Sequence, residues 1–197
     1  MIYTNGYIVK DINDNEDLII KDDIYRGLET YYSWPLEKKD DIVSRELTRL
    51  AEASFEENSL EGNFYYEILT DVELLKRYVN HCNELQIEII IMRVMTNKNA
   101  FIANEELNET EVLGYDCIAG YAYSYLSDIH VESQNDFAQN DFASYKTLKD
   151  KTNSNGLLNT YDEVEDFIVK RNKLLEQGIN LEDYWEPVPA RLSLVEI

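Results

Sequence analysis

Three side chains that can ligate a metal occupy alternate positions in the segment Asp128-Ile129-His130-Val131-Glu132. On a strand, Asp128, His130 and Glu132 would share one face, and carboxylate and imidazole groups are common metal ligands. The same alternation of polar and apolar residues is typical of any half-exposed strand. No other cluster supplies a partner histidine or a general base. A metal-dependent enzyme is therefore one alternative, and a solvated strand face is the other.

The sequence contains none of the common motifs of catalytic chemistry. It has no glycine-rich phosphate loop, no GxSxG elbow and no HExxH zinc motif. His81 and Cys82 are adjacent in a helix-like run, where neighbouring side chains point in different directions, so we interpret His81 as a satisfied, half-buried residue. The segment from Asp11 to Asp22 resembles a calcium loop but lacks its glycine and its final glutamate. We expect no catalytic residue and no cofactor.

The charge balance is the strongest signal in the composition. Asp and Glu number 39 against 18 Lys and Arg, which gives a formal net charge of -21. Charge of this size repels phosphate backbones and anionic membrane surfaces, so we expect neither nucleic acid nor membrane as a direct partner. It attracts basic proteins. Solubility alone is the competing explanation, and the retained lysines argue against a salt-adapted surface.

Carboxylates and tyrosines gather in the middle of the chain, beside the strand-like runs. We interpret them as the surface that meets a basic partner, with rigid aromatic anchors surrounded by carboxylates. The alternative is that the tyrosines pack on the core with their hydroxyls at its rim. The candidate partner-binding residues are Glu105, Glu106, Glu109, Glu111, Asp116, Tyr121, Tyr123, Tyr125 and Asp128.

The elements that must position these residues are read from periodicity and capping signals. The β-branched run from Leu85 to Met95 predicts a central strand, and Val112 to Ile118 predicts a second strand. Asn5-Gly6 indicates a tight hairpin or turn. A first helix is predicted over Leu36–Phe55. A second helix is predicted from a capping box at Thr70–Glu73 to about Glu84, and a third from a capping box at Thr160–Glu163 to Gly178. A closing strand is predicted over Arg191–Ile197.

This order of elements predicts the fold class and the number of domains. Helices that alternate irregularly with strands favour an α+β domain, with a central, mostly antiparallel or mixed sheet packed against several helices. One domain over residues 1–197 is the simplest division for a chain of this length. Cys82 and Cys117 fit small core residues better than a disulfide. Without a signal-like N-terminus or a long apolar run, we expect a cytoplasmic protein.

In size, acidity, signal-free N-terminus and tyrosine-rich acidic loops, with the run Leu113-Gly114-Tyr115-Asp116, the chain resembles small acidic bacterial immunity proteins of polymorphic and contact-dependent toxin systems. The resemblance implies a cytoplasmic inhibitor that blocks the active cleft of a basic toxin domain, for example a nuclease. It transfers no individual family residue. The alternatives are a phage-encoded DNA mimic that inhibits a host nuclease, the metal-dependent enzyme above, and a small stress or scaffold domain.

Overall fold

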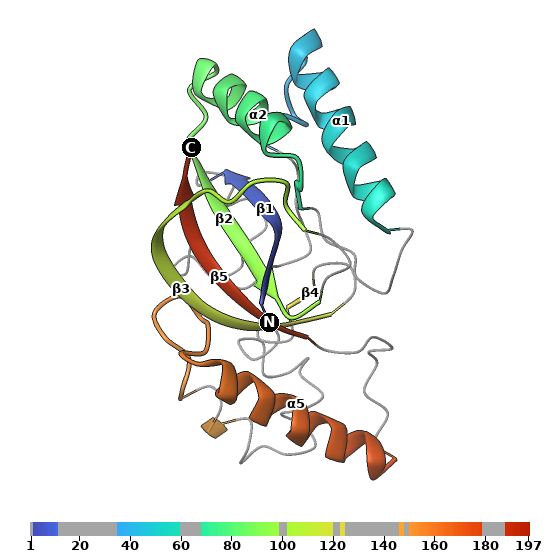
Figure 1. Cartoon of the computed structure of the whole chain (residues 1–197), viewed down its shortest axis with the longest axis vertical. Helices are drawn as coiled ribbons and strands as arrows, with labels where there is room; N and C mark the ends of the chain where they lie inside the picture. The colour runs from blue at the N-terminus through green and yellow to red at the C-terminus, as the bar shows by residue number, and fades with distance from the viewer. Residues whose placement is uncertain are drawn as a thin grey trace.

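The computed structural model describes residues 2–11, 35–59, 68–98, 102–119, 123–124, 146–147, 150–178 and 188–197. Its strands are β1 (Tyr3–Asp11), β2 (Ile89–Thr96), β3 (Asn108–Ala119), β4 (Tyr123–Ser124) and β5 (Val188–Glu196). Its helices are α1 (Ile42–Ser59), α2 (Val72–Glu84) and α5 (Tyr161–Glu176). The sheet lies between α1 and α2 at one end and α5 at the other (Figure 1). The predicted α+β class is confirmed.

The five strands follow the order β1-β2-β5-β3-β4, and each neighbouring pair is antiparallel. The run predicted as a central strand, Leu85 to Met95, forms β2 only from Ile89 onward, because Leu85 caps the end of α2. β2 lies between β1 and β5, as its apolar, β-branched composition requires. The second predicted strand is β3, although it begins earlier, at Asn108. The closing strand β5 inserts between β2 and β3, so the two strands predicted first do not touch each other.

Alternation along the strands divides the core between the two faces of the sheet. On one face, Tyr7, Ile91 and Val195 pack with residues of α1 and α2, such as Leu47 and Leu75. On the other face the core is formed by side chains from all four long strands and from the segments around Ile68 and Leu157, and it comprises Ile8, Ile68, Met92, Val94, Leu113, Ile118, Leu157, Val188, Ala190 and Leu192. The sheet therefore separates two cores, and Glu109, Glu111 and Asp116 of β3 lie in the layer between them.

The predicted turn at Asn5-Gly6 is wrong, because β1 runs through these residues as one strand. The pairing with β2 shifts its register between Thr4 and Gly6. The amide of the buried Asn5 side chain donates to the carbonyl of Lys98 at 3.0 Å and accepts from the backbone N–H of Thr96 at 2.8 Å. The side chain thus supplies the hydrogen bonds that the bulge removes from the ladder.

Capping residues define where the helices begin. The box predicted at Thr160–Glu163 is present, and it starts α5. The box predicted at Thr70–Glu73 is wrong by one residue, because the carboxylate of Asp71 is the cap and accepts from the backbone of Glu73 and Leu74. The helix that follows it ends at Glu84, as predicted. The first predicted helix begins at Ile42 instead of Leu36.

Candidate functional site

The structure describes part of the predicted partner-binding surface. Tyr121, Tyr125 and Asp128 lie outside the described residues, and so do His130 and Glu132 of the alternative metal site. The backbone of Tyr123 forms β4, which pairs with the end of β3. Within the described ranges, no group of three or more His, Cys, Asp and Glu side chains could hold a metal ion. The site can therefore be built only from the glutamates of β3 and the residues around them.

Glu109 of β3 is bound by arginines from the two neighbouring strands. Arg191 of β5 donates to both carboxylate oxygens, each at 2.7 Å, and Arg93 of β2 donates to Oε2. The hydrogen bonds from Arg191, followed by those from Ser193 and Arg93, lower the pKa of Glu109 to about 2. Two arginines already neutralise this glutamate, so we assign it a structural role within the sheet and not a contact with a partner.

Arg93 explains why a charge is tolerated in the middle of the sheet. Its side chain is 9% exposed, and it also reaches the Leu107 carbonyl and the Ser193 hydroxyl, each at 3.4 Å. A guanidinium presents several donors in one plane, so one arginine can satisfy acceptors on three sides. The ion pair with Glu109 offsets the cost of placing this cation on the core side of the sheet.

Asp116 does not belong to an exposed binding surface, because its exposed fraction is 0%. It lies opposite Ala190 in the β3–β5 ladder, and its Oδ1 accepts from the backbone N–H of Cys117 at 2.7 Å. A partner cannot contact this carboxylate while the strand is folded. The prediction that included Asp116 in the partner surface is corrected on this ground.

Glu105 and Glu106 are exposed, and both are tied to neighbouring elements. Glu105 forms an ion pair with Lys76 of α2 at 3.2 Å. The pKa of Lys76 is raised by the hydrogen bonds that it donates, first to Glu73 and second to Glu105. Glu106 accepts from the Thr4 hydroxyl at 3.0 Å. These contacts fix the acidic segment between α2 and β1.

Glu111 is the predicted glutamate of β3 that has no ion pair with a described residue. It is exposed and pairs in register with Leu194 of β5. Two residues further along β5, Glu196 is exposed on the same face, because alternate residues of a strand share a face. Among the described residues, neither carboxylate has a hydrogen-bond or ion-pair partner. Sequence reasoning missed Glu196, because its position beside Glu111 depends on where β5 inserts.

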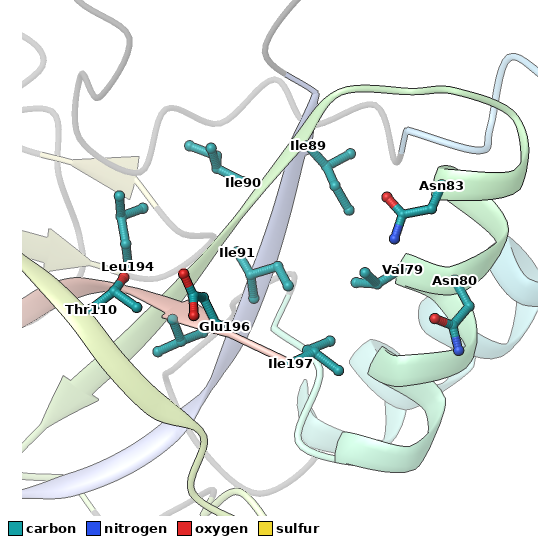
Figure 2. A pocket seen from close by; sticks show the side chains of 11 residues that line it. Val79, Asn80, Asn83, Ile89, Ile90, Ile91, Thr110, Leu194, Glu196 and Ile197 are labelled. Atoms are coloured by element: carbon teal, nitrogen blue, oxygen red, sulfur yellow. The ribbon is translucent and has the colours of Figure 1, made fainter.

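A groove of about 440 Å³ is lined by Glu196 and by Thr110, the residue that precedes Glu111 (Figure 2). Its walls are Val79, Asn80 and Asn83 of α2, residues 89–91 of β2, Thr110 of β3 and residues 194–197 at the end of the chain. Most of the wall is aliphatic, with amide, hydroxyl and carboxylate groups interspersed. A mostly apolar hollow with a few polar groups is the usual form of a binding site. Its residues come from four elements, so no local sequence signal marks it.

His81 joins α1 to α2, as expected for a satisfied histidine. Its Nδ1 lies 3.0 Å from Glu84, and its Nε2 lies 3.2 Å from Asp41 and 3.1 Å from the Ser44 hydroxyl. The hydrogen bond with Glu84 is the largest cause of the raised pKa of His81, which the interactions with Asp41 also raise. Cys82, next to it, is buried and free, so the prediction of a core thiol is confirmed.

No protein family matches the chain, and no curated protein or solved structure shows significant similarity to it. In the part of the chain that the structure describes, no helix has both the length and the apolar character needed to cross a bilayer. The function must therefore be inferred from the charge of the chain and from the geometry of the sheet.

Proposed function

We propose that this protein is an immunity-type inhibitor, which binds a basic toxin domain and blocks its active cleft. The observation that carries the proposal is the net charge of -21 on a folded α+β domain. Such a surface attracts a cationic cleft and repels the phosphates that the cleft would otherwise hold. The proposal needs no catalytic residue and no cofactor in this chain.

The distribution of charge within the sheet supports the proposal. Arg93 and Arg191, the cations of the central strands, are bound to Glu109 and offer little to an acidic partner. Glu111 and Glu196 remain exposed and uncommitted within the described residues. A second group of exposed carboxylates, including Asp162, Glu165 and Asp166, lies on the solvent side of α5.

The test is to isolate the partner and measure how salt affects its binding. The full chain, immobilised by a tag, should recover a basic protein in stoichiometric amount. The association rate of the purified pair should then fall at least about tenfold between about 50 and 300 mM NaCl, because salt screens electrostatic steering. A partner of neutral or acidic charge, or a rate that does not change with salt, would contradict the proposal.

Charge variants must avoid the glutamates that hold the sheet together. Neutralising Glu109 would leave two arginines without their carboxylate, so slower binding of that variant could reflect damage to the fold. Glu106→Gln with Glu111→Gln removes two charges from the same region and leaves those ion pairs intact. We expect this pair to slow association with the partner and to leave the free energy of unfolding within about 0.5 kcal/mol of the wild type.

A further inference from the structure

The two central strands of the sheet separate at one end. The ladder between β2 and β5 extends from Thr96 paired with Ala190 to Met92 paired with Leu194. Beyond that point β2 continues along β1 as far as Ile89, while β5 continues along β3 as far as Glu196. Figure 2 shows the strands diverging there, with the groove between them.

This separation leaves two strand edges that pair with no other strand among the described residues. In an antiparallel sheet, successive backbone N–H and C=O groups point alternately to the two neighbouring strands. Residues 89–91 of β2 and residues 195–196 of β5 therefore direct some of these groups into the gap. No described residue forms a ladder with them on that side. An exposed sheet edge offers backbone N–H and C=O groups from one strand, whereas this gap offers them from two strands that face each other.

The side chains around the gap define what could enter it. Ile90 and Leu194 are half-buried and form an apolar floor on one face of the sheet. Glu111 lies beside Leu194 on β3, and Glu196 follows it on β5, so two carboxylates flank the apolar contact. A cationic side chain that reached this face would meet both of them. On the opposite face the groove is lined by Ile91, Val195 and Val79 of α2, so it suits a segment in which basic and apolar residues alternate.

We propose that the gap between β2 and β5 receives a short, extended, basic segment of the partner protein. The segment adds as a strand between Ile90 and Val195, packs its apolar side chains on the face that Ile91 and Val195 share with α2, and directs lysine or arginine on the opposite face toward Glu111 and Glu196. About three residues fit, because the separated part of β2 is three residues long and a strand advances about 3.3 Å per residue. The inference deepens the proposed function, since it rests on a basic partner.

A synthetic peptide tests the site without the partner. The probe is a blocked pentapeptide of alternating arginine and valine, titrated into isotope-labelled full-length protein and followed by NMR. We expect saturable shifts of the amides and methyl groups of residues 89–91 and 194–197. The same peptide with N-methylated valines keeps its charge and loses two backbone donors, so it should bind at least about tenfold more weakly.

Matched protein variants separate local recognition from general attraction. Glu111→Gln with Glu196→Gln should weaken peptide binding about fivefold, because two flanking carboxylates are lost. Glu165→Gln with Asp166→Asn removes the same charge from exposed positions of α5 and should change binding by less than about twofold. Asn80→Trp, at an exposed wall position of α2, should block the groove, whereas Asn172→Trp on α5 should not.

The outcomes distinguish this site from the proposed function. Shifts confined to the groove, lost on N-methylation and on Asn80→Trp, support the strand-addition site. No binding at about 5 mM peptide, shifts centred elsewhere, or equal weakening by the two charge pairs would overturn it. In each of those cases a basic partner recovered with the full chain would still support the inhibitor function. Failure to recover such a partner would count against the inhibitor function alone, because the peptide titration does not use the partner.

Discussion

Replacing Glu109 with glutamine should destabilise the protein through the two arginines that it serves. The pKa of Glu109 is lowered from 4.5 to about 2, which corresponds to about 3 kcal/mol of preference for the ionised form as an upper limit. The side chain is 26% exposed, so solvent screening reduces this value. We expect Glu109→Gln to lower the free energy of unfolding by about 2 kcal/mol, mainly because Arg93 loses its counter-charge.

The pH dependence identifies the ion pair as the cause. The pKa of Glu109 is lower in the folded state than in the unfolded state, so its contribution is complete above about pH 5 and disappears as the pH falls toward 2. Chemical denaturation of the wild type and of Glu109→Gln should therefore show a stability difference that narrows over that range. The glutamine variant has no carboxylate to titrate at this position, so it loses this part of the acid sensitivity.

Glu111→Gln is the matched control for this prediction. Glu111 is two residues away on the same strand, is exposed, and has no ion pair among the described residues. We expect this substitution to change stability by less than about 0.5 kcal/mol. If Glu109→Gln were no more destabilising than Glu111→Gln, or if its stability difference stayed constant from pH 7 to pH 2, the structural role assigned to Glu109 would be refuted.

Three further substitutions test the positions that hold the elements together. Gly114→Ala should cost about 2–4 kcal/mol in thermal or chemical unfolding, because Gly114 has φ +143 and a Cβ there would lie 2.8 Å from the Leu157 side chain; unchanged stability would contradict it. Thr160→Ala should cost about 1 kcal/mol by the same measurement, since it removes the cap of α5. Because the pKa of His81 is raised in the folded state, its contribution to the free energy of unfolding is complete below pH 6.5 and is lost as the pH rises through the folded-state value. His81→Gln should remove this pH dependence, and chemical denaturation at several pH values measures it.

Helix α5 could be predicted because its signals are local. The Thr160 hydroxyl and the Glu163 carboxylate are three residues apart, and together they satisfy the first backbone donors of the helix. The same reasoning placed the cap of α2 one residue early, because Thr70 and Asp71 can both accept from the first turn. In the structure Asp71 is the cap, and the backbone two residues before it is hydrogen-bonded to β1 through Leu69 and Tyr7.

The turn at Asn5-Gly6 shows how a distant contact overrides a local preference. An Asn-Gly dipeptide favours a hairpin turn when the asparagine side chain has no partner elsewhere in the fold. Here the Asn5 amide bonds to the backbone of Thr96 and Lys98, which lie more than ninety residues away in the sequence. Without the arrangement of β1 beside β2, nothing in the local sequence could indicate that these partners exist.

The contacts of the predicted acidic residues could not be read from the sequence, for a related reason. A strand with carboxylates at Glu109, Glu111 and Asp116 can direct each of them to either face, and a bulge changes the alternation. β3 has register shifts on both sides of Glu111 and Val112, so simple period-two reasoning fails there. The cations that bind Glu109 come from β2 and from the C-terminal strand, and only the strand order brings them together.

Charge alone therefore does not identify a docking surface, because acidic residues in one segment can have different roles. Glu109 is matched by two arginines and Asp116 is inaccessible, so a partner gains little from either. A carboxylate contributes to docking when it is exposed, lacks a cation of its own, and lies beside a surface that fixes the orientation of the partner. Among the described residues, Glu111 and Glu196 are exposed without a cation of their own, and they flank the apolar contact of Leu194 at the place where the central strands separate. Comparison of this pair with the equally charged pair on α5 consequently tests whether the acidity directs a partner to one place or acts only as a diffuse field.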